Sequence, residues 1–241
     1  MGIAQAGIAF RVSTPINDLP ALMTRVFDEP VVEIASPVAT RFDIRNHGDV
    51  MVQIFGDVCF ICNDDLAWPL LKDASADAAR LHAVLGRPER LMAFCHYPAG
   101  GSHGYALFEN GERLRTRLQT DGVPELPPLL ESGSPQPFER RWLGASHFVD
   151  RQGAGAAKVY YLGNRDVLLP ERELGGRLLQ DGMVALLGIC PWQTLLTATY
   201  RFFRVGTPGP GRVGEVEACS ITAGVRAAPP GRRWWRLGNK P

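Results

Sequence analysis

The segment from Cys95 to Gly104 holds the residues best placed to do chemistry. It reads CHYPAGGSHG and brings a thiol, two imidazoles and a hydroxyl onto a glycine-rich stretch. A thiol or an imidazole next to a base is the combination that nucleophilic catalysis uses. Cys95 and His96 are adjacent, however, and neighbours on a strand point to opposite faces, so they cannot form a dyad with each other. Cys95, His96 and His103 are therefore weak candidates for a hydrolase site, and the alternative is a tight strand connection that needs glycine for its backbone.

Cys59 and Cys62 form the only CxxC motif of the chain. A zinc site needs a second pair of ligands, and the sequence offers no other CxxC and no closely spaced histidine pair. A redox CxxC belongs at the start of a helix, whereas this one lies in an apolar, strand-like run. Residues three apart on a strand face opposite ways. The motif predicts buried structural thiols, and no metal or cofactor is expected.

Two strand-like runs flank Asn110 and Gly111, the dipeptide most typical of a type I′ hairpin turn. A regular register across this turn pairs Phe108 with Arg113 and Leu107 with Leu114. One face is then apolar. The other face carries the binding candidates Phe108, Arg113, Arg115 and Arg117. That face is either a solvated sheet surface or a recognition surface with an aromatic anchor, because arginine and aromatic side chains are enriched where interfaces are strong.

Residues 226–241 read RAAPPGRRWWRLGNKP, a basic aromatic tail. Its binding candidates are Arg232, Arg233, Trp234 and Trp235. Basic residues interleaved with aromatic ones can hold phosphates and stack bases, so nucleic-acid binding is one interpretation. Contact with a membrane surface and docking onto the domain are the others.

The composition is that of a globular protein with balanced charge. The 241 residues carry a formal net charge of +1, which predicts no overall attraction to nucleic acid or membrane. Five cysteines, an odd number, lie in apolar or strand-like runs and indicate reduced thiols in the cytoplasm. We expect no signal peptide and no membrane span.

The pattern along the chain predicts an α+β fold with a largely antiparallel sheet built from hairpins and two or three helices packed on one side. A hairpin over 50–62, apolar on both strands, is expected at the centre of the sheet. Helices are predicted after Asn17, over 75–85 and over 170–189, and strands over 197–205 and 213–221 are expected to pair. The Pro- and Gly-rich crossing at 120–137 predicts little regular structure. Residues 1–225 form either a single domain or two lobes joined near 122–137.

One long motif resembles a family. The hairpin GYALFENG followed by an Arg-rich strand and the segment PQPFERRW is similar to an uncharacterised bacterial domain family with a GYAxxENG hairpin and a PxxFExxW segment. The resemblance covers about residues 42–143. Its matching positions are Gly104, Tyr105, Ala106, Glu109, Asn110, Gly111, Pro135, Phe138, Glu139 and Trp142. It implies an intracellular bacterial α+β domain and brings no catalytic residues.

These observations favour a non-enzymatic protein-binding domain whose partner is unidentified. A narrower hypothesis by analogy is a cognate immunity protein that neutralises a bacterial toxin. The alternatives are a hydrolase that uses Cys95 or His96 near the Gly-rich connection at 99–104, and nucleic-acid binding through the tail.

Overall fold

A computed structural model describes residues 5–35, 37–38, 40, 42–121, 123, 125–151, 157–163 and 167–206. By internal contacts the chain divides into residues 1–207 and residues 208–241. The predicted basic aromatic tail at 226–241, with Arg232, Arg233, Trp234 and Trp235, lies outside the described residues. So does the predicted strand at 213–221.

The main element of the described residues is a nine-stranded sheet in which every pairing is antiparallel. Its strand order is β2-β12-β3-β4-β1-β5-β6-β7-β8. The predicted α+β class with a largely antiparallel sheet is confirmed. The strands are β1 (Gln5–Arg11), β2 (Val31–Glu33), β3 (Asp49–Phe55), β4 (Val58–Cys62), β5 (Arg90–Tyr97), β6 (Ser102–Glu109), β7 (Glu112–Gln119), β8 (Leu129–Gly133) and β12 (Thr199–Val205).

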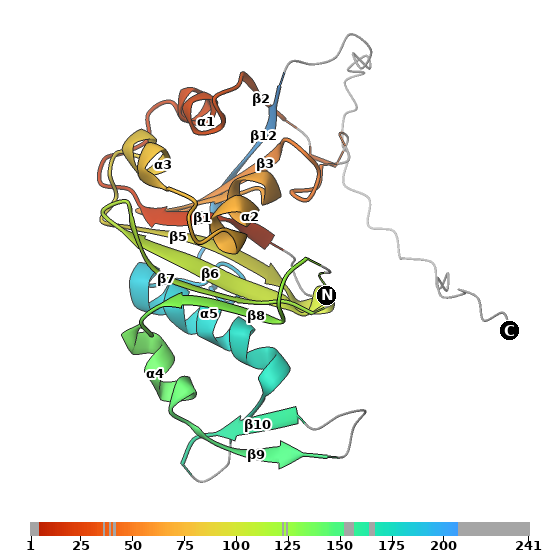
Figure 1. Cartoon of the computed structure of the whole chain (residues 1–241). Coiled ribbons are helices and arrows are strands. Elements are labelled where there is room, and N and C mark those ends of the chain that lie inside the picture. The colour runs from red at the N-terminus through yellow and green to blue at the C-terminus, as the bar shows by residue number, and fades with distance from the viewer. Residues whose placement is uncertain are drawn as a thin grey trace, which may run out of the picture. The chain divides into compact units, whose positions relative to one another are not determined.

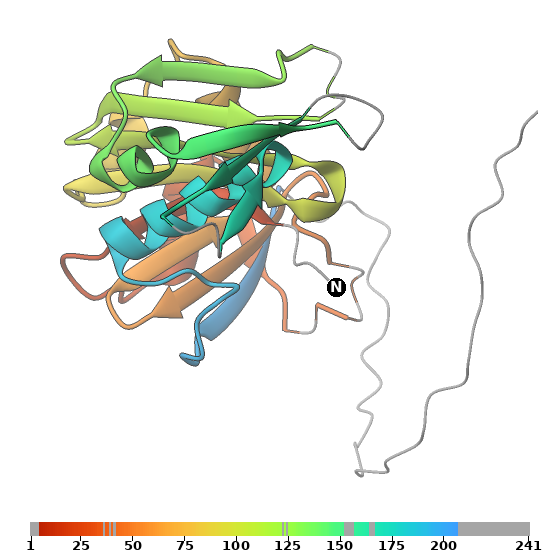
Figure 2. The same cartoon turned by 90° about the horizontal axis from the view of Figure 1, so that it is seen from below.

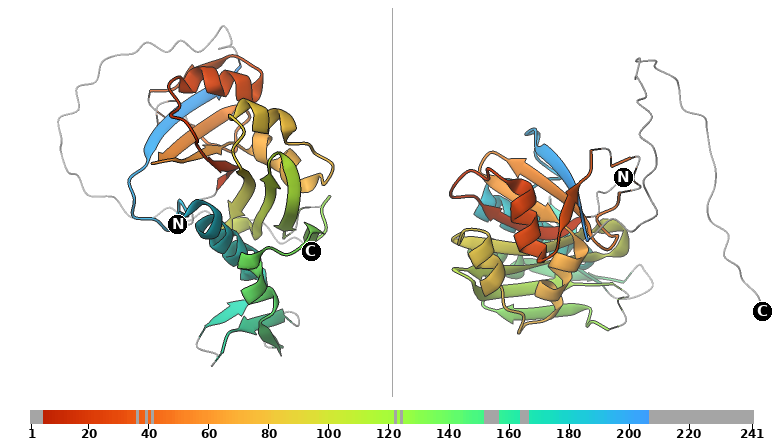
Figure 3. Two further views of the ribbon diagram at one scale, coloured as in Figure 1. Left: turned by 90° about the vertical axis from the view of Figure 1, so that its left-hand side faces the viewer. Right: turned by 90° about the horizontal axis from the view of Figure 1, so that it is seen from above.

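Helices cover both faces of this sheet, not one side as the sequence suggested (Figure 1). One face packs against α1 (Leu19–Phe27), α2 (Asp64–Lys72) and α3 (Ala79–Val84). The other packs against α4 (Pro137–Leu143) and α5 (Glu171–Leu187). Figure 2 shows α5, in cyan, lying across its face of the sheet, and the right panel of Figure 3 shows the three helices of the opposite face. We call these the α1–α3 face and the α5 face.

The apolar hairpin of β3 and β4 lies near the middle of the sheet, as predicted. All five residues of β4 are buried. Cys59 belongs to the core of the α1–α3 face and Cys62 to the core of the α5 face. The two sulfurs therefore point to opposite sides of the sheet, which confirms the expectation that this CxxC does not bring its thiols together.

The predicted long helix is α5, and its glycines have a packing role. Gly175 and Gly176 lie against the side chains of Gln119 and His103, where an added Cβ would come as close as 2.7 Å to Gln119 Oε1. Glycine lowers helix propensity by about 1 kcal/mol per residue relative to alanine. Here it permits the helix to approach the polar end of β6 and β7 closely.

The hairpin of β6 and β7 turns at Asn110 and Gly111, with φ of 50° and 88°, as the predicted turn requires. Its register is regular only for the first two pairs. Phe108 pairs with Arg113, but Leu107 pairs with Arg115, so Leu114 is a β-bulge. An extra residue in one strand moves every later side chain to the other face.

The prediction that Phe108, Arg113, Arg115 and Arg117 share one exposed face is therefore wrong. Phe108 and Arg113 point to the α1–α3 face, and Arg115 and Arg117 point to the α5 face. Phe108 is 1% exposed, Arg115 3% and Arg117 5%. Long-range contacts to α2 and α4, which the local hairpin pattern does not reveal, hold the arginines on opposite sides.

Several elements differ from the sequence expectations. The crossing at 120–137 contains strand β8, which extends the sheet beyond β7. Strand β12 pairs with β2 and β3. A second sheet consists of β9 (Ser146–Asp150), β10 (Ala157–Tyr161) and β11 (Leu168–Pro170). The left panel of Figure 3 shows β9 and β10, in green, beyond the ends of α4 and α5.

Candidate functional site

The fold brings His96 and His103 together. They face each other across β5 and β6, and their Nδ1 atoms lie 3.1 Å apart. Both side chains are buried on the α5 face, where the ring of His96 stacks on Trp192 at a centroid distance of 4.2 Å. Burial and the neighbouring His103 lower the pKa of His96 to about 4, and burial lowers the pKa of His103. The pair is therefore neutral at pH 7, and one Nδ1 donates to the other.

Cys95 is not part of this cluster. It is fully buried and belongs to the core of the α1–α3 face, on the side of the sheet opposite His96. Burial raises the pKa of its thiol far above the ordinary value. A thiolate is the nucleophile in cysteine chemistry, and this thiol is held neutral and out of reach of both imidazoles. The expected separation of Cys95 from His96 is confirmed, and their suggested catalytic role stays an untested prediction.

Two buried polar atoms near the histidines lack a hydrogen bond within the described chain. Gln5 is the cross-strand neighbour of His96 on β1, and its Oε1 has no partner. The Nε1 of Trp192 likewise has none. The sequence analysis did not single out these residues. Their only sequence signal is polarity in an otherwise apolar strand for Gln5 and a helix-breaking Pro191 before Trp192.

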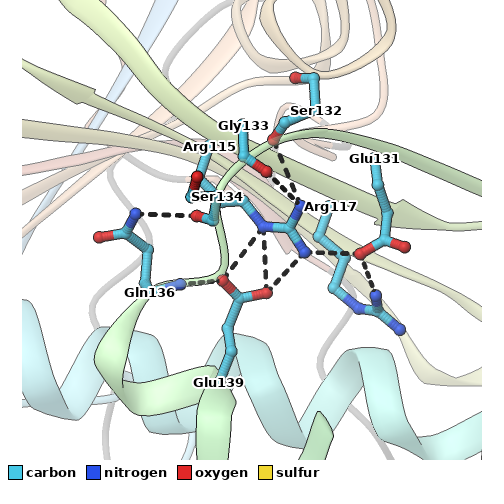
Figure 4. A network of polar contacts seen from close by, with 8 residues as sticks. All are labelled: Arg115, Arg117, Glu131, Ser132, Gly133, Ser134, Gln136 and Glu139. Carbon is cyan, nitrogen blue, oxygen red and sulfur yellow. Dashed lines mark hydrogen bonds and ion pairs between the residues drawn. The ribbon is translucent and has the colours of Figure 1, made fainter.

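The second polar cluster is an ion-pair network between β7, β8 and α4 (Figure 4). Arg115 donates to both oxygens of Glu139 from Nε at 3.1 Å and to Oε1 from Nη2 at 2.8 Å. Its remaining donors reach Glu131 Oε1 at 2.5 Å and the carbonyls of Ser132 and Gly133. Burial acts to lower the pKa of Arg115, but the bonds to Glu139 and Glu131 raise it overall. Arg115 is thus a saturated structural cation.

Arg117 is much less well satisfied. Its Nη1 donates to Glu131 Oε1, while its Nε is buried and has no partner within the described residues. Burial acts to raise the pKa of Glu131, but Arg115 and Arg117 lower it overall. Figure 4 shows the guanidinium of Arg117 extending past Glu131 on the side of the translucent α5 helix. It lines a pocket of about 360 Å³.

Arg113 lies on the α1–α3 face, opposite Arg115 and Arg117, and holds parts of the fold together there. It donates to the carbonyl of Leu70 in the last turn of α2 at 2.9 Å. It also donates to the carbonyls of Asp73 and Ala76, which follow the helix, at 2.9 and 3.0 Å. Its guanidinium also lies 4.7 Å from the centre of the Phe108 ring. A cation near a helix C-terminus satisfies carbonyls that have no partner within the helix.

The small sheet presents exposed apolar side chains in a regular arrangement. On one side, His147, Tyr160 and Leu169 are cross-strand neighbours, and Tyr160 and Leu169 pack into the α5-face core. The other side carries Phe148, Val159, Tyr161, Leu168 and Pro170, which we call the outer apolar face. Phe148 is 38% exposed and Leu168 52%. The rings of Phe148 and Tyr161 lie 6.3 Å apart.

No group of three or more His, Cys, Asp or Glu side chains among the described residues is arranged to hold a metal ion. None of the helices in this part of the chain is both long and apolar enough to cross a membrane. Comparison with protein-family models, with curated proteins and with solved structures finds no match for this chain.

Proposed function

We propose that this protein is a non-enzymatic protein-binding domain and that the outer apolar face of the small sheet is its docking surface. The observation that carries the proposal is the exposure of aligned apolar side chains on three neighbouring strands, with the exposed Phe148 and Leu168 on the two outer strands β9 and β11. A sheet usually buries one apolar face against another layer. Contiguous exposed apolar patches commonly mark interaction sites.

The position of the small sheet supports the same use. Its inner side, through Tyr160 and Leu169, is already anchored to the α5-face core. The residues of the outer side belong to neither core of the described residues. Strand β9 is also an outermost strand of this sheet within the described residues. Its backbone edge allows a partner strand to pair there, a common mode of peptide recognition.

The arginine-rich hairpin supports the proposal less well than the small sheet. Arg115 and Arg117 are buried in the ion-pair network, and Arg113 is bonded to carbonyls around the end of α2. Arg113 and Arg115 donate several hydrogen bonds within the fold, and Arg117 is buried, so these side chains do not form a shared exposed surface. The docking surface is therefore assigned to Phe148, Leu168 and their neighbours.

A toxin-neutralising immunity protein in the cytoplasm is the narrower form of this proposal. The four described cysteines are free and buried, which supports a reducing compartment. In this form the partner is a toxic protein that the domain inactivates by binding. The captured partner should then arrest growth when expressed alone and lose this effect when the wild-type chain is present.

The test is a tagged pull-down from the native host with a double variant, Phe148→Ser and Leu168→Ser. A matched control replaces Leu195 and Leu196, which are exposed at 103% and 62% but lie outside the small sheet, with serine. We expect a stoichiometric partner that the wild type and the control retain and the double variant loses. A photo-crosslinking amino acid at position 148 should form a covalent bond to the same partner.

Two results would contradict the proposal. One is equal retention of the partner by the double variant, with folding verified by circular dichroism. The other is a wild-type chain that forms only homodimers in sedimentation velocity and loses them in the double variant, because the outer apolar face would then serve self-association.

A further inference from the structure

A pocket of about 360 Å³ lies between the main sheet, the small sheet and the start of α5. One wall is the α5 face of β7 and β8, with Arg117 and Leu129, and the opposite wall is β10, with Lys158 and Tyr160. The volume is at the small end of the range for ligand sites. The polar and apolar side chains that line the pocket determine which class of ligand it can bind.

Arg117 is the unusual group of this pocket. Its side chain is 6% exposed, as buried as that of Arg115 two residues away at 3%. Arg115 donates to four different residues, whereas Arg117 has one hydrogen bond, from Nη1 to Glu131. Neither Nε nor Nη2 has an acceptor among the described residues, but Nε is shielded within the fold, so Nη2 is the unused donor that faces the pocket. A buried cation with unused donors is costly, and a hydrogen bond from a guanidinium to a carboxylate is stronger than one between neutral groups.

The other polar groups of the pocket are largely committed. Gln119 donates from Nε2 to the carbonyl of Glu171 at 3.1 Å and accepts from the backbone of Gly175 at 2.9 Å. Its amide is therefore a fixed part of the wall. The ammonium group of Lys158 is 4.0 Å from Glu171 and half-exposed, so it adds a mobile positive charge on the opposite wall.

Apolar surface completes the pocket. Leu129, Leu143 and Leu174 line it together with the ring of Tyr160. A ligand that satisfies Arg117 and also covers these side chains carries an acceptor group at one end and a short hydrocarbon chain at the other. Burial of such a chain contributes about 0.8 kcal/mol for each methylene group.

We infer that this pocket binds a small carboxylic acid with a short apolar chain, its carboxylate held by Nη2 of Arg117 and its chain against Leu129, Leu143 and Leu174. The site is independent of the proposed docking surface, because it lies on the inner side of the small sheet.

The experiment is an NMR titration of the isotope-labelled full chain with three probes of equal chain length: hexanoate, hexan-1-ol and hexylamine. We expect saturable shifts of the signals of Lys158, Leu174 and Gly175 with hexanoate. Affinity for the alcohol and for the amine should be lower than that for hexanoate by about tenfold or more, since a hydrogen bond between charged groups is lost.

Two variants locate the site. Arg117→Gln should weaken hexanoate binding about tenfold or more. Because this change touches the ion-pair network, Leu129→Trp is a second variant that fills the pocket from an exposed position and leaves every charge in place. Arg177→Gln, on the outer side of α5 and absent from the pocket walls, is the matched control and should keep the wild-type affinity.

The inference is overturned if hexanoate causes only linear, unsaturated shifts, if hexylamine binds as well as hexanoate, or if Leu129→Trp retains the wild-type affinity in a folded protein. These results would leave the docking surface at Phe148 untouched, because its test measures a protein partner.

Discussion

Arg115 donates three hydrogen bonds to the carboxylate of Glu139, and both side chains are buried. The same carboxylate accepts from the backbone N–H of Gln136 at 2.6 Å and so caps the first turn of α4. One side chain thus neutralises a buried cation and fixes the start of a helix.

Replacement of Glu139 with alanine should therefore be severe. It leaves Arg115 buried with Glu131 as its remaining anion and removes the cap of α4. Loss of one partner of a buried ion pair costs roughly 3–5 kcal/mol. Urea unfolding should show this loss, while Glu173→Ala, which removes an exposed carboxylate of α5, should change the unfolding free energy by less than about 1 kcal/mol. A Glu139→Ala protein as stable as the control would show that the network is not structurally important.

The bulge at Leu114 makes a prediction about Gly133. This glycine has φ of 73°, and a Cβ placed on it would lie 1.9 Å from the carbonyl oxygen of Leu114. Gly56 has φ of 60° with no atom within 4 Å of such a Cβ, so it is a matched control. Alanine at Gly56 should cost about 1–2 kcal/mol for its left-handed backbone alone. Alanine at Gly133 should cost at least about 2 kcal/mol more in thermal or chemical unfolding, because the bulge must move. Equal losses of unfolding free energy in the two variants would mean that the bulge at Leu114 does not lie against Gly133.

The histidine pair predicts a dependence of stability on pH. The pKa of His96 falls from its ordinary value of 6.5 to about 4 in the fold. The unfolded chain therefore binds more protons between these values, and stability that is complete above pH 6.5 is lost as the pH falls toward 4. A shift of this size is worth about 3 kcal/mol, and solvent screening should reduce the observed loss to on the order of 2 kcal/mol.

The variant His96→Phe keeps an aromatic ring against Trp192 and removes the titrating group. Its unfolding free energy should depend less on pH between 4 and 6.5 than that of the wild type. His147→Phe changes an exposed ring and should retain the wild-type slope. Parallel slopes in the wild type and His96→Phe would mean that other groups cause the acid sensitivity.

The buried thiols predict slow alkylation. Burial raises the pKa of Cys95 strongly and that of Cys59 to about 12. Iodoacetamide at pH 8 should label neither residue in the folded protein, and both should react at once in urea, as peptide mass spectrometry can measure. Rapid labelling of Cys95 in the folded state would revive it as a nucleophile candidate.

The sequence correctly predicted those parts of the fold that depend only on residues close together in the chain. Asn110 and Gly111 specify their own turn, and the continuous apolarity of residues 50–62 marks a strand pair buried on both faces. Pro170 and the apolar spacing after it predicted α5. The α+β class followed from these elements.

Signals that depend on distant residues were missed or misinterpreted. The bulge at Leu114 places Arg115 next to Glu139, and nothing within the hairpin sequence indicates that partner. The pairing of β12 with β2 and β3 joins segments far apart in the sequence, and no local pattern indicates it. The histidine pair joins residues that the sequence analysis named separately, and its neighbours Gln5 and Trp192 come from opposite ends of the described chain.

The placement of β12 between β2 and β3 has a consequence for how the chain folds. Thr199 pairs with Ile54, far away in sequence, and β2 joins the main sheet only through β12. Until β12 arrives, the apolar strand β3 exposes a free backbone edge. Pairings between distant segments form slowly, and an exposed apolar edge is prone to aggregate in the meantime. Because β12 is the last described strand in the sequence, it is synthesised after the others and completes the sheet. The interval before it pairs is the period in which the chain most needs a chaperone.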